Sequence, residues 1–145
     1  MRDYTKIDAW KLADDLTVAI YDCTRTFPRD ELYGLTSQLR RAACSVPANI
    51  VEGSSRESKK EYLHFLYIAR GSLSEAQYFI HLATRLGYLS NAAPLVEHSR
   101  RTFACLHGLI GSVERETGKI ARISAKLSSL MVLSLIRIPM GPFLQ

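Results

Sequence analysis

The side chains that could perform acid–base or metal chemistry are few and scattered along this chain. Its four histidines are His64, His81, His98 and His107, and none of them belongs to an HExxH motif. The pair Glu61 and His64 has the spacing of di-iron ligands, but such a site requires the same motif on a second helix. No second copy occurs, and Glu61 also fits the start of a helix. We therefore expect no metal, no cofactor and no catalytic site.

Serines and cysteines lack the sequence surroundings that would make them nucleophiles. Gly53-Ser54-Ser55 and Gly71-Ser72 lie in helical patterns rather than in the strand–turn–helix of a nucleophile elbow, and no glycine-rich phosphate loop is present. The three cysteines are widely spaced in apolar helical patterns, which is typical of buried, reduced thiols; they are Cys23, Cys44 and Cys105. Reduced thiols and a polar first decapeptide favour a cytoplasmic location. The longest apolar run, residues 127–138, is shorter than the roughly 20 residues of a membrane span, so no membrane contact is expected.

Positive charge is concentrated in the last third of the chain. The formal net charge is +5, and residues 1–98 hold equal numbers of basic and acidic side chains. Residues 99–145 hold seven Lys or Arg and two Glu, so they carry the whole excess. A basic end of this kind suits a nucleic-acid backbone or an acidic partner, or it is a solvated helix face.

Two groups of basic residues are candidates for binding nucleic acid. The first group lies in the second helical segment and either sets helix register or holds phosphate through bidentate guanidinium bonds. The second lies at the turn into the third segment, which an antiparallel bundle places beside Lys6 and the end of the fourth segment. The candidates are Arg40, Arg41, Arg56, Lys59, Lys60, Arg115 and Lys119.

Polar and aromatic residues beside the apolar stripes are candidates for contacts between subunits. Arg41 and Glu52 are eleven residues apart, about three helical turns, so they share a helix face. Polar groups at such a seam specify register or subunit contacts. Trp10 lies off the stripe of its segment, as an interface aromatic would. The interface candidates are Trp10, Arg41, Asn49 and Glu52.

Four long segments must position these groups. Their apolar residues recur at steps of three and four, as in amphipathic helices, over about residues 8–27, 30–53, 58–86 and 91–117. Short connections force neighbouring helices to be antiparallel, which predicts an all-α, up-down-up-down four-helix bundle over residues 1–119. The spacing of Ile120, Ile123, Leu127 and Leu130 predicts that the fourth helix continues or restarts. Residues 120–145 are therefore expected to form a helical extension and an irregular tail.

Several residues mark where these helices begin and end. Asp8 and Asp30 are predicted N-caps. Ser58 and Glu61 have the spacing of a capping box, and Gly87 is a natural C-terminal stop.

Two residues interrupt the regular helical pattern. Pro47 lacks an N–H and predicts a kink near residues 43–47. Gly71 lies in the middle of a helix, where it costs about 1 kcal/mol relative to Ala. Close contact with a neighbouring helix would explain why a glycine stands there.

The runs Glu31–Ser54 and Tyr62–Ala76, together with Tyr4, Ile7 and Trp10, resemble the signature of a bacterial four-helix-bundle family. Some of its members are encoded by intervening sequences of 23S ribosomal RNA genes, and a relative is the accessory variability protein of diversity-generating retroelements. The resemblance covers roughly residues 4–118. Cys44 stands where an aliphatic residue is more usual, and the residues after about 120 exceed the usual length.

The resemblance implies a homo-oligomeric ring, typically a pentamer, without enzymatic activity. For the retroelement relative it implies a basic surface that binds nucleic acid and a reverse transcriptase partner. We therefore expect a ring-forming protein that binds RNA or DNA through basic surfaces. The alternative is a structural adaptor that binds a protein partner and has no affinity for nucleic acid. An enzyme acting on a small molecule would require a deep polar pocket with convergent ionisable groups.

Overall fold

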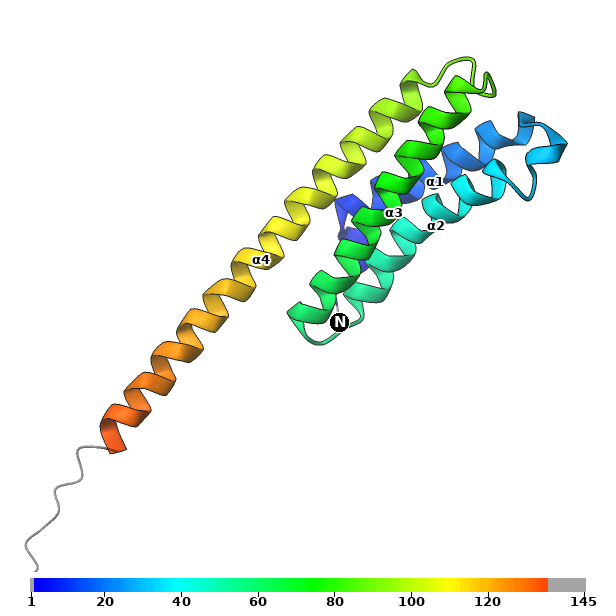
Figure 1. The fold of residues 1–145 in the computed structure, drawn as a ribbon. Coiled ribbons are helices and arrows are strands. Elements are labelled where there is room, and N and C mark those ends of the chain that lie inside the picture. Colours follow the sequence, from blue (N-terminus) through cyan, green and yellow to red (C-terminus); the bar gives the residue numbers. More distant parts are fainter. Residues whose placement is uncertain (1, 136–145) are drawn as a thin grey trace, which may run out of the picture.

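The computed structural model describes the backbone of residues 2–135 and the side chains of residues 2–120 and 123. Four helices follow one another: α1 (Asp8–Cys23), α2 (Leu35–Ser54), α3 (Lys59–Arg85) and α4 (Ala93–Leu135). α1 and α3 each pack against both α2 and α4, so the helices form an up-down bundle (Figure 1). The four-helix bundle predicted from the sequence is confirmed.

The core is formed by the apolar stripes of the four helices. Its largest fully buried aliphatic side chains come from every helix: Leu16, Ile20, Leu39, Ile50, Leu66, Leu73, Ile80, Leu106 and Ile110. Leu32 falls within the second predicted helical segment, residues 30–53, but its side chain is 50% exposed. The reason is that α2 begins only at Leu35, so Leu32 lies in the turn that precedes the helix.

Pro47 lies inside α2, and a residue of α1 compensates for the hydrogen bond that this proline removes. A proline at position 47 cannot donate to the carbonyl of Ala43, four residues earlier. The Thr17 hydroxyl of α1 lies 3.1 Å from that carbonyl oxygen and 2.8 Å from the carbonyl oxygen of Ala13. Ala43 is 1% exposed, so water does not replace the missing donor. The turn of α2 that contains Pro47 is therefore stabilised from the neighbouring helix.

The glycine that packs closely against a neighbouring helix is Gly53 of α2, against α3, and not Gly71. A Cβ atom at position 53 would lie 2.8 Å from Phe65 Cβ and 3.0 Å from Tyr62 Cδ2. A Cβ atom at position 71 would have no neighbour within 4 Å. The expectation that Gly71 marks a helix–helix contact within the bundle is therefore wrong, because it lies on the exposed side of α3.

The start and the end of α3 form as predicted. The Ser58 hydroxyl accepts the N–H of Glu61 at 3.1 Å and lies 2.7 Å from the Glu61 carboxylate. At the other end, Gly87 has a φ of 77°, and Tyr88 N–H donates to the carbonyl of Ala83 at 2.9 Å. This pairing is the Schellman motif, which needs a left-handed residue at the glycine position.

The starts of α1 and α2 differ from the prediction. Ile7 precedes α1 without a side-chain cap, and Asp8 is the first helical residue. Asp30 lies in a short 3₁₀ helix, Arg29–Glu31, and does not cap α2. Glu31 caps α2 instead, because its carboxylate accepts the N–H of Leu35 at 2.8 Å.

The carboxylate of Glu31 also joins two loops at one end of the bundle. It accepts the Tyr88 hydroxyl, from the α3–α4 loop, at 3.2 Å. The Tyr88 ring lies beside Phe27, with centroids 5.6 Å apart. Desolvation and the hydrogen bond to Glu31 together raise the pKa of Tyr88.

α4 runs through Gly118 as one helix and extends well beyond the other three (Figure 1). Its 43 residues span about 64 Å, whereas the 27 residues of α3 span about 40 Å. The predicted boundary between residues 119 and 120 lies within this helix, and residues 136–145 of the tail lie outside the described residues. None of the helices in the described part of the chain has the length and apolar character needed to cross a membrane.

Replacing Thr17 by Val removes the hydroxyl and keeps the shape of the side chain. We expect the free energy of unfolding to fall by about 1–2 kcal/mol, because a buried carbonyl loses its donor. In a protein that already carries Pro47→Ala, the new N–H at position 47 can bond the Ala43 carbonyl. The loss of unfolding free energy caused by Thr17→Val should therefore be at least about 0.5 kcal/mol smaller in that protein than in the unmodified chain. Urea unfolding of the four proteins measures this coupling. Equal costs in both backgrounds would show that Thr17 does not serve that carbonyl.

Two glycine substitutions should change stability in opposite directions. Gly71→Ala should raise the free energy of unfolding by about 0.5–1 kcal/mol, because the added methyl meets no atom and alanine favours a helix. Gly53→Ala should lower it by about 1–3 kcal/mol, because its methyl would overlap Phe65. Thermal unfolding of both variants tests the contrast. A destabilised Gly71→Ala protein would contradict this account and would place Gly71 in a contact between chains.

Candidate basic surfaces

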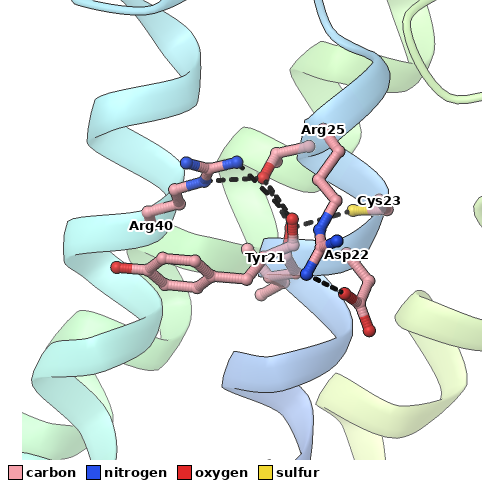
Figure 2. A network of polar contacts seen from close by, with 7 residues as sticks. Tyr21, Asp22, Cys23, Arg25 and Arg40 are labelled. Atoms are coloured by element: carbon pink, nitrogen blue, oxygen red, sulfur yellow. Dashed lines mark hydrogen bonds and ion pairs between the residues drawn. The ribbon is translucent and has the colours of Figure 1, made fainter.

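Arg40 joins α2 to the end of α1 and is held there by three contacts (Figure 2). Its Nε donates to the Thr24 hydroxyl at 2.7 Å, and Nη2 lies 3.5 Å from the Tyr21 carbonyl oxygen. Its guanidinium covers the Tyr21 ring at 4.7 Å from the centroid. Arg40 is half-buried, so these contacts give it a structural role between the two helices.

Arg41 differs from its neighbour in being exposed. Among the described residues, no carboxylate lies within 4 Å of its guanidinium. It lines a cleft shared with Tyr21 and a second groove that also holds Glu75 of α3. Its side chain is therefore available to a partner or to an anion.

The turn between α2 and α3 lies beside α4 and the N-terminal residues, as an antiparallel bundle requires. Lys59 forms an ion pair of 2.5 Å with Glu116 of α4, and Arg56 pairs with Glu52. The pair with Lys59 lowers the pKa of Glu116, chiefly through the hydrogen bond between them. Two of the predicted basic candidates are therefore neutralised locally by acidic neighbours.

The remaining candidates at this end are charged side chains that no ion pair neutralises in the described part of the chain. Lys60, Arg115 and Lys119 are exposed. None of them forms an ion pair with a described residue. Arg115 and Lys119 are one helical turn apart on α4, where it leaves the bundle. We call these three residues the α4-end basic group.

Three of the four candidate interface residues have partners within the chain, and Arg41 is the exception among the described residues. Trp10 is half-buried and meets the Tyr4 ring edge-on, with centroids 5.0 Å apart. Asn49 donates to the Ser45 carbonyl at 2.7 Å, and the hydroxyl of Ser45 lies 2.8 Å from that of Ser72 in α3. Glu52 is exposed and forms an ion pair with Arg56. Their role in contacts between subunits stays a prediction.

Groups able to do chemistry do not converge in the described residues. No three His, Cys, Asp or Glu side chains there are grouped to hold a metal ion. His98 bonds the Leu12 carbonyl through Nε2 at 3.1 Å and so links α4 to α1. Burial raises the pKa of the Cys23 and Cys105 thiols, which makes them poor nucleophiles. The Cys44 thiol lies 3.5 Å from the Tyr21 hydroxyl, and this hydrogen bond raises the pKa of Tyr21.

Two features were missed by the sequence reasoning. Arg2 donates its N–H to the Ser54 carbonyl at 3.1 Å and covers the Tyr62 ring at 4.4 Å, so it completes the end of α2. Tyr33 is 92% exposed at the rim of a surface cleft. A tyrosine before a helix-starting glycine gives no periodic signal, and Arg2 precedes every periodic segment.

Arg40 and Arg41 should differ in what they contribute to stability. Arg40→Met keeps the aliphatic stem and should lower the free energy of unfolding by about 1–2.5 kcal/mol, because it removes a hydrogen bond and a cation–π contact. The matched Arg41→Met should change it by less than about 0.5 kcal/mol. Urea unfolding of both proteins provides the comparison, and equal losses would contradict the distinct roles.

Comparisons with known proteins agree with this architecture. The model of the 23S rRNA-intervening sequence protein family matches residues 5–104. A crystal structure of a protein of unknown function from the S23 ribosomal protein family of Bacteroides thetaiotaomicron superposes with a TM-score of 0.66. The two sequences are 20% identical, and the match covers 71% of this chain and 95% of the other. At this identity the likeness is one of fold. No curated protein matches the sequence. Since the family match spans more than half of its length, this chain belongs to the 23S rRNA-intervening sequence protein family.

Proposed function

We propose that this protein is a non-enzymatic, ring-forming homo-oligomer that binds nucleic acid through the α4-end basic group. The observation that carries the proposal is the course of α4. The helix leaves the bundle beside the α2–α3 turn and continues alone (Figure 1). Arg115 and Lys119 flank Glu116, the residue of α4 that pairs with Lys59 at that turn.

The distribution of charge supports a polyanionic partner. The whole net charge of +5 lies in residues 99–145, and the two acidic residues of that stretch already have partners within the chain. Glu116 pairs with Lys59, and Glu114 accepts the Tyr67 hydroxyl. Beyond Lys119, the sequence of α4 has two further basic residues, Arg122 and Lys126, and no acidic one. A protruding helix with this composition attracts a phosphate backbone without reading its sequence.

The family match ends at residue 104, before the α4-end basic group begins. Binding by this group is therefore argued from the residues of this chain and not carried over from relatives. The assembly part of the proposal rests on the family resemblance and on Trp10, a large aromatic side chain that stays half-buried within one chain.

Removing two positive charges from α4 should weaken binding to nucleic acid and reduce its dependence on salt. For the double variant Arg115→Gln/Lys119→Gln, we expect the slope of log K against log salt to fall by up to about 2, since each lost phosphate contact removes about 0.9 for a duplex. Fluorescence anisotropy with a structured RNA, between about 50 mM and 300 mM salt, measures this slope.

The matched control is Arg85→Gln/Arg101→Gln, which removes the same charge from exposed positions of α3 and α4 away from the α2–α3 turn. It should leave the slope unchanged. Light scattering on the same samples gives the number of subunits, and a monomer would contradict the assembly. Absence of RNA binding at about 50 mM salt would contradict the proposed function and favour an adaptor for a protein partner.

A further inference from the structure

A surface cleft between α1 and α2 holds features that the bundle itself does not require. It has a volume of about 460 Å³, within the range of sites for small ligands. It extends along α2 over its first three turns, from Thr36 to Cys44. The side chains that carry the argument are Tyr21, Leu32, Tyr33, Thr36, Arg40 and Arg41.

The lining of this cleft favours an anion. It contains two arginines and several hydroxyl groups, and no carboxylate. Arg40 is held in place by its contacts with Thr24 and Tyr21, and its guanidinium contributes a fixed positive charge to the wall of the cleft. Arg41 is exposed and has all five guanidinium donors to offer, a geometry that matches phosphate or carboxylate. Glu75 of α3 lines the adjoining groove together with Arg41, and the two form no ion pair.

A buried hydroxyl in the cleft wall has no hydrogen-bond partner among the described residues. Thr36 is 3% exposed, and its Oγ1 bonds neither a side chain nor a carbonyl. A threonine in a helix ordinarily bonds the carbonyl four residues earlier, but Leu32 lies before α2 begins. A buried polar group left in this state is costly. The oxygen is closed off from the cleft in the free chain, so a ligand bonds it only after the Thr36 side chain turns toward the cleft.

The rim of the cleft exposes a planar ring. Tyr33 is 92% exposed and its neighbour Leu32 is 50% exposed, while the Tyr21 ring on the opposite helix is 42% exposed. Arg40 covers one face of Tyr21, so Tyr33 has the ring that is open to a planar group. Exposed aromatic rings of this kind stack on nucleobases, whatever the base.

We propose that this cleft binds a phosphorylated nucleoside, whose phosphate is held by Arg41 and the Thr36 hydroxyl and whose base stacks on Tyr33. The lining has no histidine or carboxylate to act as an acid–base pair, so the ligand is bound and not transformed. The site goes beyond the function proposed for α4. Arg41 lies about 20 Å along α2 from Ser54, where this helix ends at the turn beside the α4-end basic group, so the two surfaces are distinct.

Calorimetric titration of the full chain with AMP, inorganic phosphate and adenosine tests the proposal. We expect AMP to bind saturably and more tightly than either fragment. Arg41→Gln should weaken both AMP and phosphate by at least about tenfold, because it removes a charge-assisted pair. Tyr33→Ala should weaken AMP and leave phosphate unchanged. Matched controls at exposed positions of other helices, Arg101→Gln and Tyr78→Ala, should bind AMP as the unmodified chain does.

Thr36→Val supplies a readout that does not depend on a folding defect. It removes an unpartnered hydroxyl and keeps the side-chain shape, so the midpoint of thermal unfolding without ligand should rise while AMP affinity falls. The proposal is overturned by any of three results: no saturable binding of AMP, equal AMP affinity in Arg41→Gln, or a lower unfolding midpoint in Thr36→Val.

A fluorescent single-stranded oligoadenylate separates the two sources of such a ligand. If AMP displaces the oligonucleotide and Arg41→Gln weakens both, the cleft holds a nucleotide within a strand. If Arg41→Gln weakens AMP alone, the cleft holds the free nucleotide, and the proposal stands in that form. The double variant Arg115→Gln/Lys119→Gln should bind AMP normally, so a failure of the function proposed for α4 is distinguishable from a failure here.

Discussion

The close approach of α2 to its two neighbours is the constraint on which the rest of the bundle depends. Small side chains along α2 bring backbones near enough for hydroxyl groups to cross between helices. Thr17 then reaches the carbonyl that Pro47 leaves without a donor, and Ser45 meets Ser72 of α3. Gly53 permits a close contact with Phe65 of α3, where a Cβ atom would not fit. A bulkier residue at these positions would separate the helices and leave buried polar atoms without partners.

The fold was largely predictable because the helix stripes and two of the end signals are local. Ser58 caps a residue three positions on, and Gly87 supplies a backbone conformation that few other residues adopt. The start of α2 was not predictable in the same way. Its cap is a glutamate, Glu31, that precedes the first helical residue by four positions, and the intervening turn carries apolar residues that continue the helical spacing. Gly71 was misread because composition cannot distinguish a glycine facing a neighbour from one facing solvent.

The candidate sites were harder to predict than the fold, because whether a basic side chain is free to bind a partner depends on the acidic side chains that lie beside it in the folded chain. The sequence places Lys59 near the end of the fourth helix, but it does not reveal that Glu116 neutralises it. Arg40 and Arg41 are adjacent and chemically alike, yet one is fixed by α1 and the other is exposed. The unpartnered hydroxyl of Thr36 depends on where α2 begins, which is a property of the folded chain.

Glu31 makes the two loops at one end of the bundle a single cooperative unit. Its carboxylate serves the first turn of α2 and the tyrosine of the α3–α4 loop at once. Opening either loop breaks one of the two hydrogen bonds of the Glu31 carboxylate, and the side chain that makes the other bond is then held less firmly. Fluctuations that expose the backbone of one loop are therefore coupled to those of the other, although more than fifty residues of chain lie between Glu31 and Tyr88. The local stability of this end is shared between two connections and belongs to neither alone.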